Sequence, residues 1–413
     1  KLMGHASHAD YALEDRMAGN TSRVYGLLDR VWGPAIRTAI GDRDARQALM
    51  SADGIEGKLE PWDWAYYSGK LRKASYDIDE DALRPYFEVG AVRDGAFALA
   101  NRLFGLTFRR REDLPGWHPD QQVFEVFDAD GSHLAILYMD FFARESKRGG
   151  AWMNSLRPQL RLDGEVTPIV TTNFNFPAPS RGSPSLLGLG DAETMFHEFG
   201  HALHGMLSDV TYPSLSGTSV PRDFVEFPSQ VMENWMREPE VLRMFAKHYG
   251  TGEEIPAATI ERIGASATFD QGFKTVEYLA ASYLDMAWHV RNTTEAVDPL
   301  EFERSVLDDI GLIPEIIPRY RSTYFQHIFA SGYSAGYYSY LWSEVLDADA
   351  FQAFREAGLF DPDTAARYRK EILEKGGTRP GMELYLNFRG REPDPAALLE
   401  RRGFPPEDTT ATN

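Results

Sequence analysis

The sequence predicts a mainly α-helical protein with one small β-sheet, an α+β fold, and three observations support this prediction. Apolar residues recur at helical spacing over residues 9–50. Short runs rich in β-branched and aromatic residues follow between residues 107 and 176. After residue 190 almost every segment has a helical pattern again. The 413 residues can bury a large core, either in two or three domains or in one large enzyme domain.

The N-terminal part is expected to be helical and the middle part to form the sheet. Two helices that break near Gly19 and Asn20 precede a helix that begins at Pro61 and a largely helical stretch over residues 77–105. Residues 149–154 and 180–185 have the composition of loops. Strands are expected at residues 107–110, 123–127, 134–139 and 166–176, with a hairpin turn at residues 128–131. Later helices are expected at residues 231–236, 257–265, 273–290, 299–307, 337–356 and 363–374.

The composition argues against several classes of function. The formal charge of −19 would repel phosphate backbones, so nucleic acid is not an expected partner. The absence of cysteine excludes disulfides and thiolate chemistry. No apolar run approaches the ~20 residues that a membrane helix needs, so a membrane is not an expected partner either.

The first residues have neither the apolar core nor the cleavage site of a signal peptide, which favours a cytoplasmic location. The chain starts at Lys1 and not at methionine, so we expect a longer gene product. A periplasmic or secreted location therefore stays open at this point.

The residues with the clearest chemistry lie in the stretch 191–204. His197 and His201 are four residues apart and so lie on one face of a helix, while Glu198 points roughly 100° away. In this His-Glu-x-x-His pattern the histidines hold Zn²⁺ and the glutamate takes the proton of a zinc-bound water. Because so short a pattern also occurs by chance, a third ligand is needed.

Glu226 is the candidate third ligand. It lies 25 residues after His201, on a second helix expected over residues 223–235. The loop at residues 214–222 allows this helix to return antiparallel to the first one and to bring Glu226 to the histidines. A set of two histidines and one glutamate leaves a fourth position for water. The sequence therefore predicts a catalytic site with one zinc ion per chain.

These residues resemble the thimet-oligopeptidase family of zinc peptidases, and within it they look most like the peptidyl-dipeptidases, also called dipeptidyl carboxypeptidases. The resemblance rests on His-Glu-Phe-Gly-His from His197 and on residues 216–230, and it extends over nearly all of the chain. It implies a zincin-like catalytic region of the thimet-oligopeptidase and neurolysin type. It also implies that His197, His201 and Glu226 are zinc ligands and that Glu198 is the catalytic base.

Members of this family are longer, with a helical N-terminal portion that covers one wall of the active-site channel. The chain resembles their catalytic portion over residues 1–413, with the sheet at about 107–176, the zinc-helix core at about 189–237 and a helical part at 238–413. The expected partners are short peptide substrates and, as a separate chain, the N-terminal portion itself.

A stretch that begins at His327 offers further hydrogen-bond donors. Tyr333, Tyr337 and Tyr340 follow at steps of four and three residues and so share one helical or near-helical face, which by itself favours core packing. The resemblance implies instead that these side chains face substrate. We assign Tyr333 and Tyr340 to hydrogen bonds with the oxyanion and the substrate, and His327 and Tyr337 to substrate binding.

Three more side chains belong to the neighbourhood of the expected metal ligands. Glu193 is assigned to orient a ligand histidine through a hydrogen bond, with a plain surface glutamate as the alternative. Glu233, seven residues after Glu226, is a weaker candidate for the same kind of role. His204 resembles a ligand in its spacing, but the set is complete without it, so we expect a structural histidine.

The sequence thus predicts zinc-dependent hydrolysis of peptide bonds in short peptides, with release of dipeptides from a free C-terminus. An endo-acting oligopeptidase of the same family is the nearest alternative, and a fragment that binds peptide without turnover is the alternative from another class. Dipeptide release requires a cation that binds the terminal carboxylate, and arginine suits its bidentate geometry. No arginine stands out in the sequence for this role, and the alternative is that the cation belongs to the N-terminal portion of the longer family members.

Overall fold

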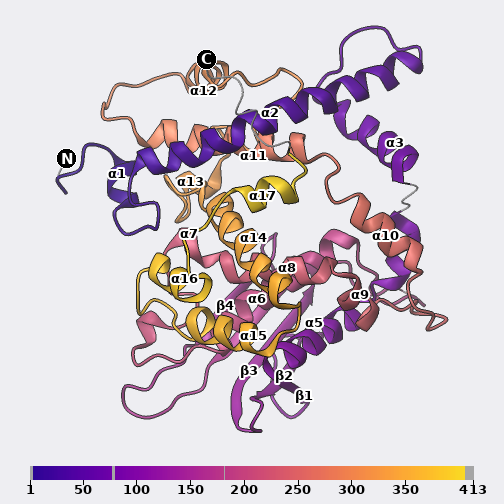
Figure 1. Cartoon of the computed structure of the whole chain (residues 1–413), viewed down its shortest axis with the longest axis vertical. Coiled ribbons are helices and arrows are strands. Elements are labelled where there is room, and N and C mark those ends of the chain that lie inside the picture. Colours follow the sequence, from indigo (N-terminus) through magenta and orange to yellow (C-terminus); the bar gives the residue numbers. More distant parts are fainter. Residues whose placement is uncertain (1–2, 77–79, 181, 405–413) are drawn as a thin grey trace. The chain divides into compact units, whose positions relative to one another are not determined.

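The structure is mostly helical and contains one five-stranded sheet, which confirms the expected fold class. The computed structural model describes residues 3–76, 80–180 and 182–404. The chain divides into two compact units, of which the first comprises residues 1–78, 265–345 and 395–413. The second unit comprises residues 79–264 and 346–394. Figure 1 shows the elements of both units, with labels on many of them.

The first unit is helical. Gly19 has a φ of 72°, and the side chain of Asn20 accepts a hydrogen bond from the backbone N–H of Arg23, so the expected break between the first two helices is confirmed. The helices of this unit are α1 (His8–Leu13), α2 (Thr21–Ala52), α3 (Trp64–Tyr76), α11 (Gln271–His289), α12 (Pro299–Asp309), α13 (Gln326–Phe329), the first part of α14 (Ser339–Ala357) and α17 (Ala396–Arg401).

The second unit combines the sheet with helices. Its helices are α4 (Glu80–Leu83), η1 (Arg84–Tyr86), α5 (Val89–Phe104), α6 (Leu189–Met206), η2 (Pro213–Leu215), α7 (Arg222–Val225), α8 (Phe227–Arg237), α9 (Pro239–Phe245), nearly all of α10 (Ala257–Ala265), the rest of α14, α15 (Pro362–Tyr368), η3 (Arg369–Leu373) and α16 (Gly381–Arg389). Residues 84–88 interrupt the expected helix over 77–105, and residues 77–79 of that prediction lie outside the described residues. The same holds for residues 405–413 of the expected C-terminal helical part.

The sheet has the strand order β1-β2-β3-β5-β4. Its strands are β1 (Thr107–Arg110), β2 (Gln122–Phe127), β3 (His133–Phe142), β4 (Trp152–Arg157) and β5 (Ile169–Phe176). β3 and β5 are parallel, and the other neighbours are antiparallel. The hairpin turn between β2 and β3 is confirmed, with Gly131 at a φ of 83°. β1 and β4 are therefore the edge strands of this sheet.

One strand contradicts the sequence-based expectation. Residues 152–154 were expected in a loop, but they begin strand β4, which pairs antiparallel with β5 through partners such as Asn154 and Thr171. The reason for the error is that the strand carries no alternation of buried and exposed side chains, since its last four residues are all exposed. Pairing with β5 holds this segment in place where its side chains are exposed.

Among the described residues, no helix is both long and apolar enough to cross a membrane.

Candidate active site

Helix α6 carries the His-Glu-x-x-His residues and lies in the second unit, next to the sheet (Figure 1). At its start the side chain of Asp191 accepts a hydrogen bond from the backbone N–H of Gly188 (3.0 Å), and its negative charge also favours a helix N-terminus. The following apolar residues, such as Met195, Phe196 and Phe199, are fully buried. The helix is therefore an internal element whose polar groups need partners within the protein.

The two histidines of α6 meet Glu226 as the sequence predicts. The Nε2 atoms of His197 and His201 lie 3.3 and 3.1 Å from the same carboxylate oxygen, Oε2 of Glu226. One potential ligand atom from each of the three residues lies within 4.8 Å of the others. Two imidazole nitrogens and one carboxylate oxygen facing a common point fit the donor set of a catalytic zinc ion.

Glu226 stands at a break between two helices, whereas one continuous helix was expected over residues 223–235. It ends α7 and precedes α8, and Pro228 lies in the first turn of α8. The hydroxyl of Ser229 donates a hydrogen bond to the backbone carbonyl of Glu226 (2.8 Å). This break gives Glu226 a fixed backbone at the point where its carboxylate turns to the histidines.

Glu198 lies beside this cluster, and its side chain is only 5% exposed. Its Oε2 atom is buried and has no hydrogen-bond partner among the residues that the structure describes. Burial raises the pKa of Glu198, positive charge on His197 and His201 would lower it, and the charge of Glu226 raises it further. A buried carboxylate without a protein partner, held next to a metal-ligand set, can accept a proton from a water in that position.

The charges within the ligand set depend on one another. Burial opposes a charge on His197, but hydrogen bonds to Glu226 and Glu233 raise its pKa well above the usual value. Burial likewise opposes ionisation of Glu226, but hydrogen bonds to the two histidines keep its pKa well below the usual value. A metal ion must displace the proton of His197 to bind at its Nε2, so metal affinity is expected to fall as the pH is lowered.

Close contact between α6 and α8 fixes the distance between the histidines and Glu226. A Cβ atom on Gly200 would lie 2.6 Å from Cα of Ser229 and 2.7 Å from the carbonyl oxygen of Pro228. Both of these atoms belong to the backbone of α8, so they cannot move aside as a side-chain end could. Only glycine allows this approach.

We therefore expect Gly200→Ala to lower the free energy of unfolding by about 1–3 kcal/mol through overpacking and to weaken zinc binding. Gly190→Ala is the matched control, because Gly190 lies on the same helix with nothing within 4 Å of an added Cβ. Chemical denaturation and zinc titration of both variants provide the measurement. Equal effects of the two substitutions would contradict the role of this contact.

Glu233 provides a second carboxylate that contacts a ligand histidine, His197. Oε1 of Glu233 lies 2.6 Å from Nδ1 of His197, on the far side of the ring from Nε2. Glu193, to which the sequence assigned such a contact, pairs instead with Arg237. The contact with Glu233 selects the tautomer of His197 whose Nε2 is free to bind metal. The structure thus favours Glu233 over Glu193, and the role of Glu193 stays a prediction.

Glu233→Ala is expected to weaken zinc binding by about 10- to 100-fold, since a carboxylate that orients a ligand histidine has an effect of this size. Glu193→Ala should change zinc affinity much less, because its partner is Arg237. Competition with a chromogenic chelator measures both affinities. The reverse order of effects would restore the assignment made from the sequence.

His204 is completely buried on α6, and neither ring nitrogen has a hydrogen-bond partner among the described residues. Burial lowers its pKa to about 3, with a smaller contribution from His201. It is therefore a neutral side chain at ordinary pH, and it is absent from the three-residue ligand cluster. This environment agrees with the structural role expected for it.

The tyrosines predicted to bind substrate form a cluster in the first unit. The rings of Tyr333 and Tyr340 stack, with their centroids 5.4 Å apart and their planes at 5° to each other. The centroid of the His327 ring lies 6.0 Å from that of Tyr333 and 5.6 Å from that of Tyr337. Tyr337 is only 3% exposed and packs in a core cluster with Phe325, so packing contributes to its environment. The substrate contacts of all four residues stay predictions.

The backbone that carries these tyrosines is not helical throughout. Residues 332–338 form turns, and only Tyr340 lies on helix α14. Ala335 has a φ of 51°, which is unusual for a residue with a side chain. The fully buried carboxylate of Asp285 accepts hydrogen bonds from the backbone N–H groups of Ala335 (2.9 Å) and Tyr337 (2.8 Å). Asp285, which no sequence pattern singles out, therefore holds this turn.

The structure brings two groups of predicted residues together, each within its own unit. His197, Glu198, His201 and Glu226 meet in the second unit, and His327, Tyr333, Tyr337 and Tyr340 meet in the first.

Comparison with known proteins gives a family. The profile of peptidase family M3 matches residues 1–404. The chain is 40% identical to dipeptidyl carboxypeptidase of Salmonella typhimurium, over 98% of this chain and 60% of the relative. It is 37% identical to oligopeptidase A of Escherichia coli over the same shares. The chain thus spans about 60% of the length of these curated relatives.

A solved structure supports the fold alone. An M32 carboxypeptidase from Deinococcus radiodurans matches with a TM-score of 0.53 and 13% sequence identity, over 96% of this chain and 68% of that one. At this identity the likeness concerns the arrangement of elements and not the substrate.

Proposed function

The chain belongs to peptidase family M3, and we propose that it is the catalytic part of a zinc peptidase that releases dipeptides from the free C-terminus of short peptides. The observation that carries the proposal is the cluster of His197, His201 and Glu226, with the buried carboxylate of Glu198 beside it. The 40% identity of the chain to a dipeptidyl carboxypeptidase favours dipeptide release over the other specificities of the family.

The residues of the cluster fit one zinc ion. His197 and His201 would hold it through Nε2 and Glu226 through a carboxylate oxygen. Such an ion polarises a carbonyl oxygen and lowers the pKa of water. Glu233 keeps His197 in the tautomer that offers Nε2, and Glu198 takes a proton and passes it to the leaving amine. Tyr333 and Tyr340 donate hydrogen bonds to the oxygen on which negative charge develops, and His327 and Tyr337 bind substrate.

A peptide substrate would pair with the free edge of β4. This strand is an edge strand, and its Met153 packs against α6, where a Cβ on Gly205 would lie 2.5 Å from Cε of Met153. Gly205 follows His201 by one helical turn, so β4 runs close to the helix that carries the ligands. Pairing with a sheet edge recognises the backbone of an extended peptide, whatever its side chains.

Mass spectrometry of an octapeptide incubated with the zinc-loaded protein tests the proposal, once with a free C-terminus and once amidated. Successive loss of dipeptides from the free form only is the expected result. Internal cuts in both forms would support the second candidate, an endo-acting oligopeptidase, which the 37% identity to oligopeptidase A favours. No cleavage would support a fragment that binds peptide without turnover.

The proposal includes a partner polypeptide and a cellular location. Relatives are longer than this chain, and an added polypeptide that corresponds to their unmatched portion is the expected partner. A rise in the rate on titration of that polypeptide is the result that would support it. A cytoplasmic location stays a prediction from the sequence.

A further inference from the structure

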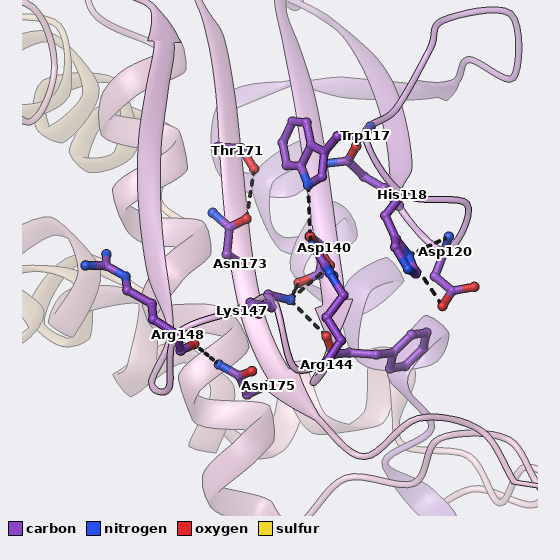
Figure 2. Close-up of polar contacts among 12 residues, drawn as sticks. Trp117, His118, Asp120, Asp140, Arg144, Lys147, Arg148, Thr171, Asn173 and Asn175 are labelled. Carbon is purple, nitrogen blue, oxygen red and sulfur yellow. Dashed lines mark hydrogen bonds and ion pairs between the residues drawn. The ribbon is translucent and has the colours of Figure 1, made fainter.

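The loop between β3 and β4 is held by one buried carboxylate. Asp140, which is 1% exposed, accepts hydrogen bonds from both terminal nitrogens of Arg144 (2.8 and 2.7 Å) and from Nζ of Lys147 (2.9 Å). The indole N–H of Trp117 donates a further bond to it (3.2 Å). Burial opposes ionisation of Asp140, but the bonds from Arg144 and Lys147 lower its pKa to about 2. Figure 2 shows these side chains gathered around the carboxylate.

The third cation of this loop, Arg148, is different. Its backbone carbonyl accepts a hydrogen bond from the side chain of Asn175 (2.8 Å), which fixes its Cα next to β5. Its guanidinium lies over the ring of Trp152, 4.3 Å from the centroid, and points away from Asp140 and Lys147 (Figure 2). The side chain is exposed, and no described carboxylate forms an ion pair with it.

Arg148 lies just before the start of β4. This position determines which end of a peptide paired with β4 lies near its guanidinium. A peptide that pairs antiparallel with β4, the more stable of the two directions, has its C-terminal end opposite the N-terminal end of β4. Between Arg148 and the strand lie Gly149 and Gly150, both exposed and with nothing within 4 Å of an added Cβ. These glycines leave the space beside the strand end open to a ligand.

We propose that Arg148 binds the terminal carboxylate of a peptide paired antiparallel with β4, and thereby favours peptides with a free C-terminus. The inference rests on the peptidase function proposed above. A guanidinium accepts a carboxylate through two parallel N–H···O bonds, and stacking on Trp152 orients the guanidinium before the peptide arrives. Arg148 thus supplies the cation for dipeptide release that the sequence alone did not identify.

Binding is measured apart from hydrolysis in the Glu198→Gln background, by fluorescence anisotropy of a labelled hexapeptide as free acid and as amide. The free acid is expected to bind more tightly, and Arg148→Gln to weaken its binding by about 10- to 100-fold, as for the loss of a hydrogen-bonded charge. Binding of the amide should stay within about twofold. Arg148→Lys keeps the charge but not the bidentate geometry, so its effect on the free acid should be intermediate.

Arg157→Gln, at the other end of β4 from Arg148, is the control. This arginine donates to the backbone carbonyl of Thr167, so its loss should leave the preference for the free acid intact. A preference that survives Arg148→Gln, or an equal loss of acid and amide binding, would overturn the inference. Circular dichroism on each variant ensures that the comparison is made between folded proteins.

The result separates this inference from the proposed function. If the unmodified site never cleaves peptide but Arg148→Gln abolishes the preference for the free acid, hydrolysis is refuted and the carboxylate site stands. If dipeptides are released while Arg148→Gln leaves the preference for the free acid unchanged, the proposed function stands and the role of Arg148 in carboxylate binding is refuted.

Discussion

Glu198→Gln is expected to lower kcat for peptide hydrolysis by about 10²- to 10⁴-fold, the range for loss of a positioned general base. The substitution preserves the shape of the side chain but removes its ability to accept a proton. Glu198 is 5% exposed and its buried Oε2 has no partner among the described residues, so an amide fits in its place without breaking a protein hydrogen bond. Zinc content should remain at one ion per chain, because Glu198 does not belong to the ligand cluster.

Glu226→Gln is the companion variant, since Glu226 is an equally buried carboxylate that does belong to the cluster. It should lose zinc as well as activity. Elemental analysis after dialysis and steady-state kinetics of both variants give the comparison. Full activity of the Glu198→Gln protein would refute the assignment of Glu198 as the general base. Loss of zinc from this protein would indicate that Glu198 is itself a zinc ligand.

The elements that the sequence predicts well are those whose pattern follows from burial. The two N-terminal helices, the hairpin of β2 and β3, and α10 lie where apolar periodicity and turn residues place them. β4 escapes this reasoning, because an edge strand whose side chains are mostly exposed carries no alternation. The break at Glu226 is not predicted either, since the apolar pattern continues from the end of α7 into α8.

In the site, too, features set by the geometry of one helix can be predicted from the sequence, and features set by the packing of two helices cannot. The spacing of His197 and His201 on one helix is fixed by helical geometry, so the sequence can predict that they meet a common point. Which carboxylate supports His197 depends on how α8 packs against α6 at Gly200, and this is a property of two helices. Periodicity within one helix favoured Glu193, whereas the packing brings Glu233. Arg148 is singled out only once Asp140 has been seen to bind the neighbouring cations.

Tyr333→Phe and Tyr340→Phe are each expected to lower kcat by about 10²- to 10³-fold, with much less change in KM, the effect of losing one donor to the oxyanion. The two rings stack with centroids 5.4 Å apart, and phenylalanine keeps this contact while it removes the hydroxyl. A loss of activity without a loss of stability would therefore report on the hydroxyl itself. Steady-state kinetics and thermal unfolding of both variants provide the measurement.

Tyr324→Phe is the matched control, because Tyr324 precedes the same segment and its side chain is 54% exposed. Its hydroxyl should be dispensable for kcat. If Tyr333→Phe and Tyr340→Phe change only KM, the hydroxyls bind the ground state and the transition state equally, and their role is substrate binding. If they change only the melting temperature, the tyrosine cluster is a piece of core, as their spacing alone suggests. A fall in kcat at constant stability is the one outcome that places these hydroxyls at the reacting carbonyl.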